Sequence, residues 1–171
     1  MRFRGVAILT IGLVLGAGAT ALAYTAPFFL PHHGETARWV RDMKLEDYGR
    51  QRVIYHVDQR AGFLNGRYRH ILQVAQNHVD AVGMDKLDLR IVLQGEGLDF
   101  LIWAKGNSAA QKQIDHLKLE GVKFEICRNT LIARRLDPDT DLYDVKPEDV
   151  VRAGVGEIAA LESQGFQYIK P

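Results

Sequence analysis

The sequence contains very little cysteine, and this scarcity excludes several kinds of site. Cys127 is the single cysteine among 171 residues, so the chain forms no internal disulfide and contains no CxxC metal or redox motif. The composition, with 47% hydrophobic and 25% charged residues, is that of an ordinary globular domain. A disordered or collagen-like chain is therefore excluded.

An excess of charge of either sign is also absent. The 22 Lys and Arg residues nearly balance the 21 Asp and Glu residues, and the longest basic run is the pair Arg134-Arg135. Such a chain has no general field that attracts a phosphate backbone or an anionic membrane. We therefore expect no nucleic-acid partner.

Histidine occurs six times but never at the spacing of metal ligands. No two histidines form an H-x-x-x-H pair, and the doublet His32-His33 has no matching cluster of ligands. The sequence also lacks a G-x-S-x-G nucleophile elbow and a complete dinucleotide-binding fingerprint. It therefore predicts no metal site, no cofactor and no hydrolase chemistry.

Residues 1–23 have the pattern of a signal peptide. Arg2 and Arg4 precede an uncharged stretch that ends in the small-residue pattern Ala21-Leu22-Ala23, where a signal peptidase would cleave. A retained anchor is the alternative, because the apolar stretch reaches the lower limit of a bilayer span. We expect cleavage and a periplasmic or secreted protein, with membrane contact only if the segment is retained.

The rest of the chain divides into a tether with a short helix at 24–51 and a folded domain at 52–171. A β-prone run at 53–57 predicts the first strand. Apolar residues then recur at steps of three and four from Leu64 to Val82, which predicts a helix that Gly83 ends.

The remaining segments continue this alternation of strands and helices. They are a strand at 87–93, short helices at 98–105 and 109–117, a strand at 122–127, a helix capped by Asn129-Thr130, an acidic loop at 137–147, a strand at 150–151, a helix at 155–161 and a strand at 166–169. Each connection between strands is long enough for a crossover helix. The order therefore predicts an α/β sandwich with a mainly parallel sheet of about five strands.

Charged residues occupy one phase of two predicted strands. Asp88 and Arg90 alternate with apolar residues in one, and Lys123 and Glu125 do so in another. Strands of parallel sheets are usually apolar on both faces. We therefore expect either a thinly covered face or a position near the sheet edge, which an oligomer could cover.

Ligands of parallel α/β sheets bind outside the carboxyl ends of the strands. The residues at these ends are Asp58, the segment Gln94-Gly95-Glu96-Gly97, and the segment from Cys127 to Thr130. Gly95 and Gly97 could let a backbone approach a phosphate. The full G-x-G-x-x-G pattern is absent, however, and a plain turn is the favoured interpretation.

Cys127 is the strongest candidate for chemistry. It lies in phase with Lys123 and Glu125, which places it on the more polar face of its strand. It also precedes a predicted helix, whose free amides and dipole favour a thiolate, and Arg128 adds a positive charge. The alternative is inert packing, because cysteine is among the most buried residue types. Position alone leaves both interpretations open.

The residues around this cysteine resemble the DsrE/DsrF-like family of sulfur-handling proteins, in its exported single-cysteine branch. The matching stretches cover residues 52–171 in the order of the predicted units. They are Val53-Ile54-Tyr55-His56-Val57, Gln76-Asn77-His78-Val79 with Ala81-Val82-Gly83, Val92-Leu93-Gln94-Gly95-Glu96-Gly97, Phe124-Glu125-Ile126-Cys127-Arg128-Asn129-Thr130-Leu131, Ala153-Gly154-Val155-Gly156-Glu157-Ile158 and Gln164-Gly165-Phe166-Gln167-Tyr168-Ile169-Lys170-Pro171. The resemblance implies a flavodoxin-like or Rossmann-like three-layer sandwich with a mainly parallel five-stranded sheet.

The resemblance also implies a function and a site. Cys127 would carry sulfur as a persulfide, in a thiol carrier or sulfurtransferase-like role, and the protein would form a homotrimer or hexamer. The candidate binding residues are Arg128, Asn129, Thr130, Gln94, Gly95, Glu96, Gly97, His56, Asn77 and His78. This chain departs from the cytoplasmic relay members because it has a signal peptide and no cysteine near its C-terminus. The sulfur donor and acceptor are not indicated by the sequence.

A non-catalytic module that binds a small ligand or a protein is the alternative function. It would use Gln94, Glu96 and the acidic loop from Asp137 to Asp144, which follow the ends of predicted strands. Blocking Cys127 would leave such binding unaffected.

Overall fold

A computed structural model describes residues 36–171. The chain divides into two units at residues 43 and 44, so the described residues 36–43 belong to the first unit and 44–171 form the second. The described part of the first unit holds the one-turn helix α1 (Arg38–Arg41), in which the Arg41 Nη1 atom donates to the Thr36 carbonyl over 2.7 Å. This is the short helix expected between residues 24 and 51. The predicted signal peptide at 1–23 lies outside the described residues. Within 36–171, no helix combines the length and the apolar character needed to span a membrane.

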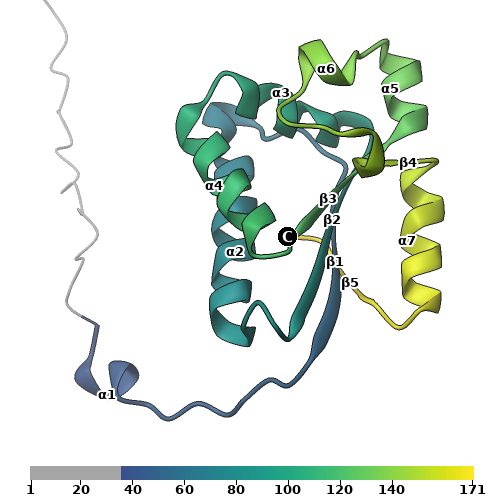
Figure 1. Cartoon of the computed structure of the whole chain (residues 1–171). Helices are drawn as coiled ribbons and strands as arrows, with labels where there is room; N and C mark the ends of the chain where they lie inside the picture. The colour runs from purple at the N-terminus through teal and green to yellow at the C-terminus, as the bar shows by residue number, and fades with distance from the viewer. Residues whose placement is uncertain (1–35) are drawn as a thin grey trace, which may run out of the picture. The chain divides into compact units, whose positions relative to one another are not determined.

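The second unit is built on a parallel sheet of five strands, as the sequence predicted (Figure 1). The strands are β1 (Gln51–Val57), β2 (Leu87–Leu93), β3 (Lys123–Cys127), β4 (Val150–Val151) and β5 (Gln167–Ile169). Their order across the sheet is β4-β3-β2-β1-β5. Val57 pairs with Leu93, and Leu93 with Ile126, so the carboxyl ends of the three central strands lie level with one another.

Helices lie on both faces of the sheet and over one of its ends, which confirms the three-layer α/β fold (Figure 1). The helices α2 (Gly66–Val82), α3 (Asp99–Lys105) and α4 (Ser108–Leu119) cover one face, and α7 (Gly154–Ser163) covers the other. The helices α5 (Arg128–Arg134) and α6 (Pro138–Asp141) lie near the end where the strands finish.

The longest helix, α2, follows the predicted spacing from Tyr68 to Val82. The predicted start was wrong, because Leu64 precedes the helix, has a φ of 59° and is exposed. The helix buries one apolar stripe against the sheet and ends at Gly83, whose φ of 93° is a conformation that other residues rarely adopt. The stripe consists of Tyr68, Ile71, Leu72, Ala75, Val79 and Val82. These side chains join the inward residues of β1, β2 and β3 in the main hydrophobic core.

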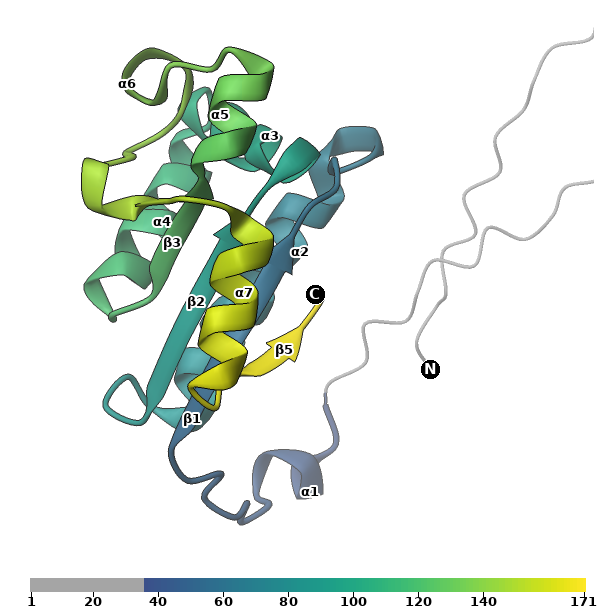
Figure 2. The ribbon, with the colours of Figure 1, turned by 90° about the vertical axis from the view of Figure 1, so that its right-hand side faces the viewer.

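The path of the chain explains why α7 lies opposite the other helices. From β1 to β4 the chain moves one strand at a time in one direction, and β5 then returns to the far side of β1. Because parallel crossovers are right-handed, reversing the direction places the connecting helix on the opposite face. Figure 2 shows α7 crossing that face from β4 back toward β5. Its N-terminus therefore lies at the carboxyl end of the sheet.

The face under α7 is the thinly covered one. Among the elements of residues 44–171, α7 is the helix that packs there. Its Ile158 and Leu161 form a small apolar cluster with Ile54, Val92 and Phe166. Beside this cluster, the Arg90 Nη1 atom donates to Glu125 Oε1 over 2.9 Å. Because β2 and β3 lie inside the sheet, the charged residues reflect a thinly covered face and not an edge position.

Two local expectations were wrong. Asn129-Thr130 do not cap α5, because β3 continues directly into the helix and Cys127, in an extended conformation, is the N-cap residue. The segment 137–147 is not entirely loop. It contains α6, which begins at Pro138 because the Asp137 side chain accepts from the Asp139 amide over 3.0 Å.

Candidate functional site

A cavity of about 440 Å³ opens at the carboxyl ends of the strands. It lies where ligands of parallel α/β sheets bind. Five segments line it: the ends of β1, β2 and β3, helix α5 and the start of α7. The lining residues are Asp58, Gln94, Gly95, Cys127, Asn129, Thr130, Ala133, Arg134, Ala153, Gly154 and Val155.

Cys127 lines this cavity from the end of β3. The pairing of β3 places its side chain on the α7 face together with Lys123 and Glu125, as the alternation predicted. The residue is 4% exposed, so the cavity is its route to solvent. A slender molecule can reach this thiol more easily than a bulky one.

The surroundings of Cys127 favour its thiolate form. Burial raises the pKa of the thiol, but hydrogen bonding from the Thr130 hydroxyl and from the backbone amides of Gly154, Thr130 and Asn129 outweighs burial and lowers the pKa. The amides come from the starts of two helices, α5 and α7. Ala153, the N-cap residue of α7, makes no side-chain capping bond, so no cap occupies the amides of the first turn of α7.

The Thr130 hydroxyl is oriented by a neighbouring backbone group. The Gly95 amide donates to Thr130 Oγ1 over 2.9 Å, which leaves the hydroxyl proton free to be donated to the sulfur. The Gly95 carbonyl in turn accepts from Arg134 Nη1 over 3.0 Å. The peptide groups at Gly95 are thus fixed on both sides, and Gly95 itself has a φ of 55°.

Replacing this hydroxyl should weaken the thiolate. We expect Thr130→Val to slow alkylation of Cys127 at pH 7 by about tenfold or more, because a hydrogen bond to a charged group is worth roughly 1.5–3 kcal/mol. The measurement is the rate of reaction with iodoacetamide as a function of pH, which should shift to higher pH. Thr130→Ser keeps the hydroxyl and is the control. Equal slowing in both variants would contradict the assigned role of the hydroxyl.

A row of three polar side chains, Gln94, His56 and Tyr168, leads from the cavity across the α7 face. The Gln94 Nε2 atom donates to His56 Nε2 over 2.8 Å, and His56 Nδ1 lies 2.7 Å from the Tyr168 hydroxyl of β5. Burial lowers the pKa of His56. The ring is therefore neutral near pH 7, as its acceptor role toward Gln94 requires.

Asp58 forms another wall of the cavity. Its Oδ2 atom accepts from Lys170 Nζ over 2.8 Å. Burial raises the pKa of Asp58, but the bond to Lys170 and the nearby His56 lower it overall. The ion pair also ties the segment after β5 to the end of β1.

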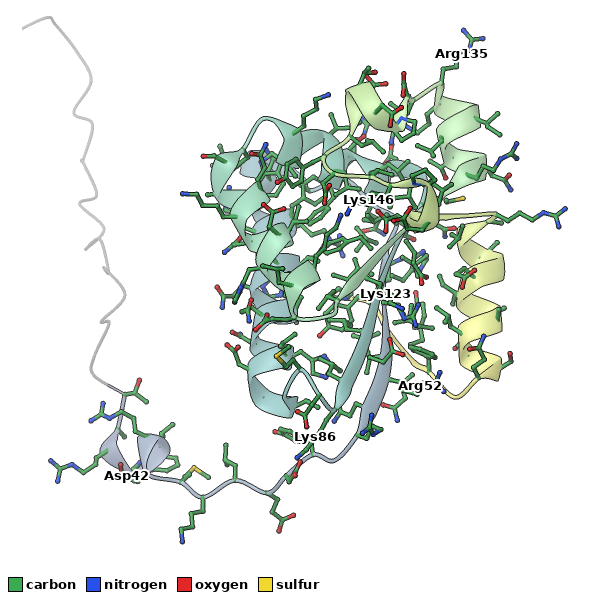
Figure 3. All side chains as sticks on the ribbon, in the orientation of Figure 1. Asp42, Arg52, Lys86, Lys123, Arg135 and Lys146 are labelled. Atoms are coloured by element: carbon green, nitrogen blue, oxygen red, sulfur yellow. The ribbon has the colours of Figure 1, made fainter. Side chains whose placement is uncertain are left out.

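Asn77 and His78 do not reach the cysteine. They lie on α2 near the opposite end of the sheet, where His78 Nδ1 is 3.0 Å from the Tyr55 hydroxyl and Nε2 is 2.8 Å from Gln51 Oε1. Figure 3 marks the two ends: Lys86, just before β2, lies at this end, and Arg135, after α5, lies at the other. The structure gives these two residues a place in the fold but none in the cavity.

Three further candidates lie near the cavity without lining it. Arg128 is exposed at the start of α5, and Glu96 is exposed and 3.4 Å from Arg60 Nε. Gly97 is buried against the end of β1, where a Cβ atom would lie only 2.0 Å from the Val57 carbonyl oxygen. Gly97 thus allows close backbone packing, and the Gly95 amide is used by Thr130, so the turn interpretation describes this segment better than a phosphate loop.

Sequence reasoning missed Arg134 and the first turn of α7. Gly154 follows the predicted fourth strand, so a helix start at the sheet's carboxyl end was a signal that could have found it. The acidic segment from Asp137 to Asp144 contributes none of the residues that line the cavity. Within residues 36–171, no group of three or more His, Cys, Asp or Glu side chains has the arrangement of a metal site.

Comparison with known proteins decides the family. The model of the DsrE/DsrF-like family matches residues 53–171, which include every strand but the first two residues of β1. The chain belongs to the DsrE/DsrF-like family. Membership in this family indicates a sulfur-related role, and it confirms the resemblance to the family seen in the sequence.

A solved structure of the same fold supports the family assignment. It is a protein of unknown function, MTH1491, from Methanobacterium thermoautotrophicum, and the two chains are 27% identical. The alignment covers 71% of this chain and 99% of that one, with a TM-score of 0.57. No curated protein matches the chain.

Proposed function

We propose that Cys127 accepts sulfane sulfur, carries it as a persulfide and passes it to an acceptor thiol. One observation carries this proposal: the thiol of a DsrE/DsrF-like chain lies in a cavity where a hydroxyl and three backbone amides favour its anionic form. A thiolate is the nucleophilic form of cysteine, and the same donors suit a persulfide anion.

The loading step needs only a sulfane-sulfur donor such as thiosulfate. The thiolate attacks the outer sulfur of the donor, a new S–S bond forms at Cys127, and the S–S bond of thiosulfate breaks. Sulfite leaves with the electron pair of that bond, and the product is a cysteine persulfide anion. In the unloading step, an acceptor thiolate attacks the outer sulfur of the persulfide, and the Cys127 thiolate is restored.

A single cysteine is sufficient for this cycle. The second sulfur comes from the donor, so no resolving cysteine is required, whereas an intramolecular dithiol redox enzyme would need one. The cavity beside the thiol leaves space for the additional sulfur atom. Donors at the starts of α5 and α7 surround that space.

The test is intact-protein mass spectrometry after incubation with thiosulfate or polysulfide. We expect the wild-type protein to gain the mass of one sulfur atom, which a reducing thiol removes, and Cys127→Ser to gain none. A protein with no adduct and with an alkylation rate no faster than that of an unfolded peptide would contradict the proposal. That result would favour the binding module, whose ligand would occupy the same cavity.

Two expectations from the sequence stay predictions. The segment 1–23, the expected signal peptide, lies outside the described residues. A homotrimer or hexamer is the expected assembly, and the exposed apolar side chains of Val155, Tyr168 and Ile169 around α7 and β5 are consistent with a covered surface there.

A further inference from the structure

The row formed by Tyr168, His56 and Gln94 is not used by the proposed sulfur transfer, yet it ends beside Cys127. It runs from β5 through β1 to the end of β2. Gln94 lines the cavity, while His56 and Tyr168 lie behind it. The three side chains are held by contacts of 2.7 and 2.8 Å. Gln94 is therefore held in one position by its neighbours.

Gln94 supports the first turn of α7. A Cβ atom added to Gly154 would lie 2.5 Å from Gln94 Oε1 and 3.0 Å from Gln94 Cβ, so the helix backbone rests directly on this side chain. Gly154 has no side chain of its own through which to hold the turn, and its N-cap residue, Ala153, makes no side-chain capping bond. The position of this turn therefore depends on what lies beneath it.

The same turn supplies a donor to the cysteine. Gly154 and Cys127 line the same cavity, and the Gly154 amide is one of the groups that lower the pKa of the thiol. It comes from a helix that is held to the sheet by a small apolar cluster, whereas the Asn129 and Thr130 amides belong to the segment directly bonded to Cys127. The Gly154 amide is thus the donor whose position is least fixed by the local chain.

We propose that Gln94, held in turn by His56 and Tyr168, is a positioning residue for Cys127: it fixes the first turn of α7 so that the Gly154 amide stays directed at the sulfur. The proposal rests on the proposed function, since it concerns the same thiol. It assigns His56 a role through Gln94 and not through contact with a sulfur donor. His56 and Tyr168 act on the turn only through their hydrogen bonds, because without these bonds the Gln94 side chain would rotate freely into the cavity.

Polar and charged groups around the row are consistent with this role. His56 accepts from Gln94 through Nε2, so the proton of its neutral ring is on Nδ1 and is directed to the Tyr168 oxygen. Asp58 and Lys170 are the charged groups that act on His56, and they pair with each other over 2.8 Å. The three side chains of the row are therefore uncharged, and hydrogen bonds hold them in place.

The test measures thiol reactivity and not sulfur transfer. We expect Gln94→Ala to shift the pH profile of Cys127 alkylation to higher pH and to slow the reaction at pH 7 roughly three- to tenfold, the value of one ordinary hydrogen bond. The limiting rate at high pH should be unchanged. His56→Ala should shift the profile in the same direction, and so should Tyr168→Phe, which removes only the hydroxyl in contact with His56 from an exposed side chain and keeps the fold.

The chain offers a matched control at the other end of the sheet. His78 is held between the Tyr55 hydroxyl and Gln51 over 3.0 and 2.8 Å, the same set of partner types that holds His56. His78→Ala should cost similar stability but leave the alkylation profile of Cys127 unchanged. An unshifted profile in both Gln94→Ala and Tyr168→Phe, or an equal shift in His78→Ala, would overturn the proposal.

The two proposals fail separately. A wild-type protein that takes up no sulfur but shows the shifted profiles would refute the persulfide carrier and retain the positioning role. If the Gln94→Ala protein takes up sulfur at the wild-type rate and its alkylation profile is unshifted, the carrier proposal stands and the positioning role is refuted.

Discussion

Replacing Arg90 by methionine should lower the free energy of unfolding by about 3–5 kcal/mol at pH 7, the usual cost of removing one partner of a buried ion pair. Glu125 has a side chain that is 8% exposed, and its Oε1 atom accepts from Arg90 Nη1 over 2.9 Å. Its Oε2 atom is buried and has no hydrogen-bond partner within the described residues. Without Arg90, the carboxylate under α7 would be a buried charge without a hydrogen-bonded cation, although Lys123 also acts on it.

The loss should depend on pH with a definite sign. Burial raises the pKa of Glu125, although the bond to Arg90 lowers it in part. A carboxyl group whose pKa is higher in the folded state binds more protons there, so stability decreases as pH rises from the ordinary Glu range through the folded pKa. Arg90→Met removes the lowering contribution and raises this pKa further. The variant should therefore lose less stability at about pH 5 than at pH 7, as measured by urea unfolding.

Arg52→Met is the control for this prediction. The Arg52 guanidinium lies 4.3 Å from the centre of the Phe166 ring, and that of Arg90 lies 5.5 Å from it. The described contacts of Arg52 include no carboxylate, and its Nη1 atom donates to the Gln164 carbonyl over 2.7 Å. Arg52→Met should lower the free energy of unfolding by about 1 kcal/mol or less, and this loss should not depend on pH. Equal losses in the two variants would show that contact with the ring, and not the charge of Glu125, explains the effect.

Gly97→Ala is the second variant for which we expect a large effect. A Cβ atom there would lie 2.0 Å from the Val57 carbonyl oxygen and 2.5 Å from its carbon, so strand β1 or the segment after β2 must move. We expect a loss of about 3 kcal/mol, the upper end of the usual cost of overpacking, because both sides of the clash are backbone. Urea unfolding measures the loss, and alkylation of Cys127 would report any displacement of the cavity wall.

Gly156→Ala provides the matched control within α7. Its Cβ atom would lie 3.8 Å from the Ala153 Cβ atom, which is an ordinary contact. Since alanine is the better helix former, this change should be neutral or stabilise the protein by up to about 1 kcal/mol. A Gly97→Ala protein as stable as the control would contradict the close approach of the two backbones.

The fold was predictable from the sequence because its signals are local. The steps of three and four along α2 and the positive φ at Gly83 belong to one segment, and the alternation in β2 needs no knowledge of its neighbours. The phase of Cys127 was predictable for the same reason, since the side of a strand follows from counting residues. The charged phase of β2 and β3 also correctly indicated a thinly covered face.

The site was only partly predictable because it depends on which segments meet. Gly154 is near Cys127 only because the chain reverses direction after β4, and no local pattern states that reversal. Asn77 and His78 occur in a stretch typical of the family, but that stretch lies toward the end of α2, which is far from the carboxyl ends of the strands. Arg128 was expected to help the thiolate through its sequence position, yet its side chain faces solvent.

The late position of α7 in the chain has a consequence for the timing of reactivity. Strands β2, β3 and β4 each pair with the preceding strand, so the sheet can form past Cys127 as synthesis proceeds, whereas α7 and β5 must first cross back over these strands. Until α7 and β5 pack onto the sheet, the Gly154 amide does not lie near the sulfur, and no helix packs on Gln94. A nascent or partly unfolded chain therefore presents a thiol of more ordinary reactivity to oxidants and to other cysteines, and the reactive thiol forms only when folding is complete.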